Sequence, residues 1–146
     1  MAVFNELQRK IGGPASSLDR GALIAAAEQE RQALIPELEH ALADARRRLV
    51  SASGDETRGD DLFIAANEIR QLAACANRPS AGRLAHLLAS YLTHCADRGE
   101  MAAAQVTVPL VRAVDQSFAV TEGDPTLKAI VDESARLIQH LGAAGD

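Results

Sequence analysis

The feature that most constrains the fold is the spacing of apolar residues between positions 62 and 76. They recur at intervals of three and four, at Leu62, Ala65, Ala66, Ile69, Leu72, Ala73 and Ala76. This spacing places them on one side of an α-helix, whereas a half-buried strand alternates at every second residue. Aromatic residues, on which sheets draw heavily, make up only 3% of the chain. Both observations favour closely packed helices.

The segment before this helix has the same periodicity. A long helical region is expected to open at Ser16 or Ser17 and to continue to Leu49. Pro36 lies within it and predicts either a kink or two helices that meet there. A Gly-Gly-Pro sequence at positions 12–14 stops the apolar pattern that precedes it, so we expect residues 1–16 to form a short helix or a loosely docked arm.

Three further helices are expected after position 76. One opens near Ser80, which can cap it, and one opens at Asp124-Pro125 and ends at Gly142. Between them, residues 100–120 contain alternating apolar residues around Pro109, so a strand is an alternative there. A kinked helix is the stronger prediction because helical segments lie on both sides.

These segments predict an all-α fold. We expect an up-down helical bundle with a four-helix core and an extra N-terminal helical segment. The length of 146 residues predicts a single domain over 1–146, with residues 142–146 as a frayed tail.

Charge and cysteine usage exclude several classes of protein. The chain has 15 basic and 20 acidic residues, whereas nucleic-acid binders usually carry a basic face. No apolar run is long enough for a transmembrane span and no basic-then-apolar leader begins the sequence, so we expect a cytoplasmic protein without membrane partners. Cys75 and Cys95 fall in helices without C-x-x-C spacing, and we expect both to be reduced, buried and apolar in role.

The basic run Arg46-Arg47-Arg48 and the four histidines are the obvious candidates for chemistry. The run is interpreted as a solvated helix end, with an Asp44/Arg48 pair one turn apart. His86 and His94 are eight residues apart on one helix, about 12 Å at a rise of 1.5 Å per residue, so one ion cannot bridge them.

His40 and His140 fall on polar faces of other helices, and we expect all the histidines to face solvent. Ser90 is one turn from both His86 and His94, but the chain has no nucleophile elbow and no phosphate loop. We therefore expect no catalytic residues, no metal and no cofactor.

Residues 60–95 resemble the histidine phosphotransfer (Hpt) domains, which are four-helix bundles. Their signature is a phosphate-accepting His followed at three residues by Lys and at four by Gly, then a short turn and a leucine-rich helix. Residues 66–73 align with this signature, and residues 79–88 align with the turn and the following helix. Asn67 stands at the place of the His, Arg70 keeps the cation and Gln71 replaces the glycine.

The resemblance implies a degenerate Hpt-like domain. An asparagine amide has a delocalised lone pair and cannot carry a phosphoryl group, so the docking surface would remain without the chemistry. The chain would bind a response-regulator receiver domain or a sensor kinase in a bacterial two-component pathway. Its layout also resembles small accessory proteins of bacterial chemotaxis, the CheE-like proteins.

The docking surface is expected on one side of the 62–76 helix. Asn67, Arg70, Gln71 and Ala74 follow one another at helical spacing, with Phe63 and Ile64 one turn earlier. If Phe63 or Ile64 is exposed, the surface has an apolar anchor among polar groups. If Phe63 belongs to the core, the polar residues are only the solvated side of a bundle helix.

Two other functions remain open. The chain could be an active phosphotransfer protein that uses another histidine, with His86 best placed on the neighbouring helix. It could also be a structural or oligomeric bundle, for example a homodimer through the long first helical region.

Overall fold

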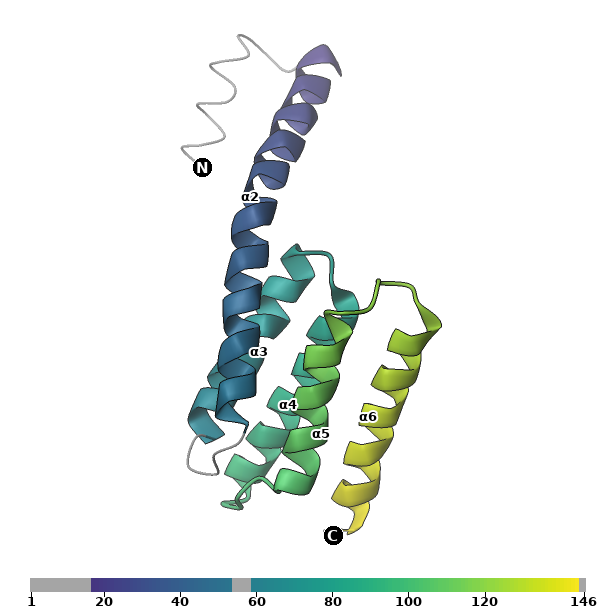
Figure 1. The fold of residues 1–146 in the computed structure, drawn as a ribbon. Helices are drawn as coiled ribbons and strands as arrows, with labels where there is room; N and C mark the ends of the chain where they lie inside the picture. Colours follow the sequence, from purple (N-terminus) through teal and green to yellow (C-terminus); the bar gives the residue numbers. More distant parts are fainter. Residues whose placement is uncertain (1–16, 54–58, 145–146) are drawn as a thin grey trace. The chain divides into compact units, whose positions relative to one another are not determined.

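The structure is a computed structural model that describes residues 17–53 and 59–144. All regular secondary structure in these two ranges is helical, which confirms the all-α prediction. The helices are α2 (Ser17–Ala52), α3 (Gly59–Cys75), α4 (Pro79–Asp97), α5 (Ala104–Ser117) and α6 (Pro125–Ala144) (Figure 1). The expected N-terminal arm over 1–16 lies outside the described residues.

The chain divides into two compact units, residues 1–37 and residues 38–146. In the first unit the described residues belong to α2, and α2 stays helical through Pro36. The alternative of two separate helices is therefore wrong. A proline removes one intrahelical hydrogen bond, but Gln32 and Pro36 are both exposed, so water can satisfy the carbonyl of Gln32.

The helix at the centre of the second unit is α4, because α4 packs against α3, α5 and α6. The reason lies in its two adjoining buried stripes. One consists of leucines (Leu84, Leu88 and Leu92) and the other of alanines (Ala81, Ala85 and Ala89). The apolar stripe that the sequence predicts in α3 is confirmed, with its members buried or half-buried.

Small residues let α3 and α4 approach closely. A Cβ atom built on Gly82 would lie 3.3 Å from the Cβ of Ala73 and 3.8 Å from the carbonyl oxygen of Arg70. This separation is tighter than ordinary van der Waals contact, so a larger side chain at position 82 requires the helices to shift.

The start of α4 differs from the expectation. The side chain of Ser80 does not cap the helix; instead, its backbone N–H donates to Oε1 of Glu122 at 2.7 Å. Glu122 lies in the connection between α5 and α6, 42 residues away in sequence. A carboxylate at a helix N-terminus stabilises the helix, because it accepts hydrogen bonds from the unpaired N–H groups and interacts favourably with the helix dipole.

The two C-terminal helices follow the sequence more closely. Residues 104–117 form α5 with Pro109 inside it, so the helix prediction is confirmed and the strand alternative is wrong. Thr126 donates its backbone N–H to Oδ1 of Asp124 at 2.9 Å, which confirms the predicted helix start. Gly142 does not end α6, which continues to Ala144.

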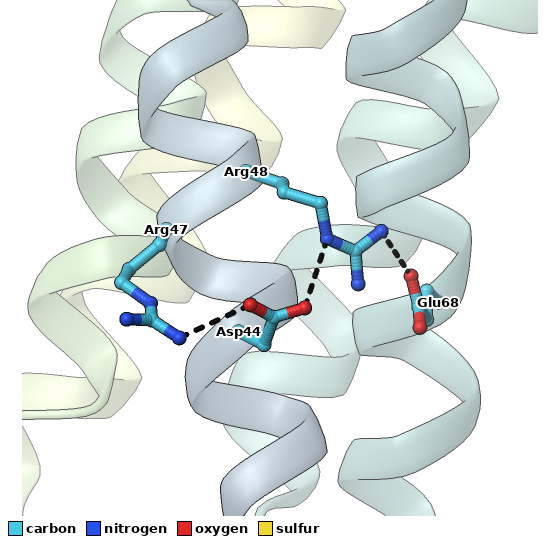
Figure 2. A network of polar contacts seen from close by, with 4 residues as sticks. All are labelled: Asp44, Arg47, Arg48 and Glu68. Carbon is cyan, nitrogen blue, oxygen red and sulfur yellow. Dashed lines mark hydrogen bonds and ion pairs between the residues drawn. The ribbon is translucent and has the colours of Figure 1, made fainter.

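Ion pairs attach the last turns of α2 to its neighbours. Figure 2 shows Arg48, whose guanidinium contacts Oδ2 of Asp44 at 3.2 Å and Oε2 of Glu68 in α3 at 2.7 Å. The hydrogen bond to Glu68 raises the pKa of Arg48. Arg47 also contacts Asp44, at 3.0 Å. The expected Asp44/Arg48 pair is therefore confirmed.

The remaining arginine of the run takes part in a second contact. Nε of Arg46 donates to Oδ1 of Asp115 in α5 at 2.6 Å, and its guanidinium lies 5.1 Å from the centre of the Phe118 ring. The guanidinium of Arg78 also lies over this ring, at 5.7 Å. Each arginine of the 46–48 run thus has a carboxylate partner.

Candidate functional site

A polar groove of about 370 Å³ lies between α3 and α4, and we call it the α3–α4 groove. Residues of α3 on one side and of α4 on the other line it: Phe63, Asn67, Arg70, His86, Ala89, Ser90, Thr93, His94 and Asp97. The groove therefore brings together the central part of the expected docking surface and the histidine proposed as the alternative phosphate acceptor.

The α3 side of the groove follows from helical spacing. Phe63, Asn67 and Arg70 are one and two turns apart, beside the stripe that α3 buries in the core. Arg70 donates from Nη2 to Oδ1 of Asn67 at 2.7 Å. This hydrogen bond holds the guanidinium beside the amide and leaves the amide N–H₂ of Asn67 as a further donor.

On the α4 side, His86, Ser90 and His94 are spaced four residues apart, which corresponds to about 6 Å per step along the helix. All three are exposed. The hydroxyl of Thr93 donates to the carbonyl of Ala89 at 2.9 Å. Nε2 of His94 lies 3.5 Å from Nη1 of Arg98.

The four histidines are exposed, as the sequence predicts. His40 lies on α2 and His140 on α6, and neither lines the α3–α4 groove.

The exposure of the two apolar candidates decides a point that the sequence left open. Phe63 is 37% exposed and Ile64 is 56% exposed. The alternative in which Phe63 belongs to the core is therefore wrong. Ile64, Gln71 and Ala74 are exposed on α3 but do not line the groove.

Sequence reasoning did not identify Thr93 and Asp97 as groove residues, nor that Ser90 and His94 face Asn67. The four-residue spacing along α4 was visible in the sequence. Which side of α4 faces α3 depends on the packing of the two helices, and periodicity within one helix does not determine that.

The groove suits recognition of a polar or charged group. It offers a guanidinium, an amide, two imidazoles, two hydroxyls and a carboxylate that water can reach. Solvent-accessible polar groups in a groove can form hydrogen bonds and ion pairs with the surface of a binding partner. Within residues 17–53 and 59–144, no three His, Cys, Asp or Glu side chains are placed to hold a metal ion.

The two cysteines differ from each other in the structure. Cys95 is buried, as expected, but Cys75 is exposed, so the prediction for Cys75 is wrong. Position 75 is the last residue of α3 and lies off the buried stripe that includes Ala73. Both thiols are free.

In the described part of the chain, no helix is both long enough and apolar enough to cross a membrane. Scans against protein-family models and searches of curated proteins and solved structures found no match to this chain.

Proposed function

We propose that this chain is a non-catalytic, Hpt-like interaction protein of a bacterial two-component or chemotaxis pathway. It docks a response-regulator receiver domain, or a sensor kinase, through the Asn67 side of α3. The proposal includes the up-down four-helix core that the sequence predicts. Asn67 at the place of the phosphate acceptor makes the role one of binding and not of phosphoryl transfer.

The observation that carries the proposal is the exposure of Phe63 next to polar side chains. A partner that covers a large exposed apolar side chain removes it from water, which is favourable, and binding energy often concentrates at such an anchor. Asn67 and Arg70 lie beside it in the same groove. An apolar centre with polar neighbours is the usual composition of a protein-binding surface.

The electrostatics of the groove support an acidic partner surface. Arg70 is held by Asn67, so part of the entropy of ordering its side chain is already lost before binding. The phosphorylation site of a receiver domain is an acidic pocket, and a guanidinium at the groove is complementary to it. Arg70 is therefore the residue on which specificity should depend most.

The test is direct binding of the intact protein to purified receiver domains and sensor kinases of the same organism, measured by calorimetry. Arg70→Glu should weaken binding at least about tenfold, because it places a carboxylate against an acidic surface. Arg112→Glu, which changes an exposed arginine of α5, is the matched control and should leave the affinity unchanged. Failure of every receiver domain and sensor kinase to bind would refute the proposal.

A second experiment isolates the apolar anchor. Phe63→Ala should weaken the same complex, whereas Val50→Ala, at an exposed position of α2, should not. Equal affinity for the wild type and Phe63→Ala would remove Phe63 from the interface.

A second candidate function is supported by the position of His86. This exposed imidazole lies in the same groove as Arg70 and Asn67. In this case the phosphoryl group of a receiver aspartate would move to a ring nitrogen of His86: the P–O bond to the aspartate breaks and a P–N bond forms. Arg70 would then contact the phosphoryl oxygens.

Incubation with a phosphorylated receiver distinguishes the two functions. Acid-labile label that is lost in His86→Gln and kept in His94→Gln would favour phosphotransfer. A complex without label would favour docking alone. Label that survives His86→Gln would exclude His86 as the acceptor.

A further inference from the structure

A second hollow, of about 550 Å³, adjoins the α3–α4 groove, and we call it the apolar cavity. Phe63 and Thr93 line both hollows. The larger apolar side chains around it come from α3, α4, α5 and the connection before α5: Leu62, Phe63, Leu92, Met101 and Val108. Its volume lies within the range of about 300–1,000 Å³ that is typical of small-molecule sites.

Part of the apolar wall of this cavity is exposed to water. Met101 is 74% exposed and Val108 is 37% exposed, so apolar surface at the cavity remains in contact with water. A ligand that covers these side chains removes that surface from water, which is favourable.

The charges around the cavity indicate the kind of ligand. Among the described residues that line it, Asp60 and Glu100 are the charged side chains, and both are exposed carboxylates. Glu100 also lies 3.5 Å from Nε of Arg98, so Asp60 has the larger expected effect. An anionic ligand would bring its charge against two carboxylates, whereas a cationic one is attracted to both.

We propose that the apolar cavity binds a small lipophilic cation, with an alkyl chain against the apolar walls and an ammonium group near Asp60. The binding of this ligand does not depend on the proposed docking function, although Phe63 and Thr93 line both hollows. A positively charged, aliphatic small molecule is thus the expected ligand class.

The cysteines supply a reporter and an internal control. Cys95 lines the cavity and is buried. Cys75 is exposed on α3 and does not line the cavity. A ligand in the cavity should therefore slow the alkylation of Cys95 and leave the alkylation of Cys75 unchanged.

The experiment uses the full chain and three probes with the same eight-carbon chain: octylamine, octanol and octanoate. Iodoacetamide labelling of each cysteine is followed by mass spectrometry as the probe concentration rises. Octylamine should protect Cys95 at a concentration about two to five times lower than octanol does, the range expected for exposed ion pairs. Octanoate should be the weakest of the three.

The charge contribution is tested with Asp60→Asn combined with Glu100→Gln. Both positions are exposed, so the variant should fold, and its circular dichroism verifies this. In this variant octylamine and octanol should protect Cys95 equally. Arg112→Glu is a control that changes charge away from the cavity.

Three results would overturn the proposal. The first is that no probe protects Cys95. The second is that octylamine slows both cysteines alike, which would indicate nonspecific association. The third is that the preference for octylamine over octanol is absent in the wild type or persists in the double variant.

Discussion

The hydroxyl of Tyr91 is the acceptor that connects α4 to the start of α5, and its removal should destabilise the fold. The backbone N–H of Ala103 donates to this oxygen at 3.0 Å. Ala103 is the N-cap residue of α5, and both residues are half-buried. Tyr91→Phe keeps the ring in place but leaves that N–H without its partner.

The expected cost follows from the loss of one hydrogen bond. The hydrogen bond contributes about 1 kcal/mol net, and the half-buried N–H left without an acceptor adds part of its desolvation penalty. Together they should lower the free energy of unfolding by about 1–2 kcal/mol. For a unit of this size the melting temperature should fall by about 3–8 °C. Urea denaturation followed by circular dichroism measures the change, and Ser90→Ala, an exposed substitution on the same helix, should stay within about 0.5 kcal/mol.

The ionisation of Tyr91 supplies an independent measurement, because it is the only tyrosine and the chain has no tryptophan. Burial, opposed by the hydrogen bond from Ala103, raises the pKa of Tyr91 above its ordinary value of 10.0. The unfolded chain therefore loses this proton first as the pH rises. The associated stability is fully present below pH 10.0 and is lost as the pH rises through the folded pKa.

Absorbance at 295 nm follows the phenolate directly in the folded protein. A midpoint above that of the urea-unfolded chain is expected. Identical midpoints would contradict the burial of Tyr91, and unchanged stability in Tyr91→Phe would refute the contribution assigned to its hydrogen bond with Ala103.

Three further predictions concern the helix contacts and caps. Gly82→Val should lower the free energy of unfolding by about 1–3 kcal/mol in urea denaturation, because the new side chain overlaps Ala73, and adding Ala73→Gly should restore part of this stability. An unchanged free energy of unfolding in Gly82→Val would mean that α3 and α4 lie farther apart than the structure shows. Glu122→Ala should cost about 1 kcal/mol by the same assay, because Ser80 loses its acceptor, and an unchanged midpoint would contradict this cap. The hydrogen bond from the backbone of Thr126 lowers the pKa of Asp124, so its stabilisation is present above pH 3.8 and is lost as the pH falls through the lowered pKa. The protection of the amides in the first turn of α6, taken relative to the intrinsic exchange rate at each pH, should therefore fall in acid for the wild type, and Asp124→Asn should reduce this dependence.

Helix positions were predictable because each depends on local chemistry. The start of α6 at Asp124-Pro125 requires only a side chain that accepts a backbone N–H and a proline without one. The buried stripe of α3 requires only helical spacing. By contrast, the acceptor at the start of α4 is Glu122, which lies 42 residues away in sequence from Ser80, and no local pattern indicates that pairing.

In the candidate site, too, the sequence predicted what lies within one helix and not what lies between two. Asn67 and Arg70 could be identified from the sequence because they lie one turn apart on a single helix, and they are joined by a hydrogen bond. Spacing on α3 alone could not show whether Phe63 is exposed or which residues of α4 face it. Those features depend on how closely the backbones of the two helices approach.

The sequence determined that this chain is helical, where most helices begin and which side of α3 is buried, because these properties arise from residues within a few turns of each other. Only the tertiary structure placed α4 at the centre of the second unit, opened the α3–α4 groove around Asn67 and His86, and left Phe63 partly exposed. The physical reason is that small side chains at Gly82 and Ala73 set the separation of two helices, and that separation depends on both partners together.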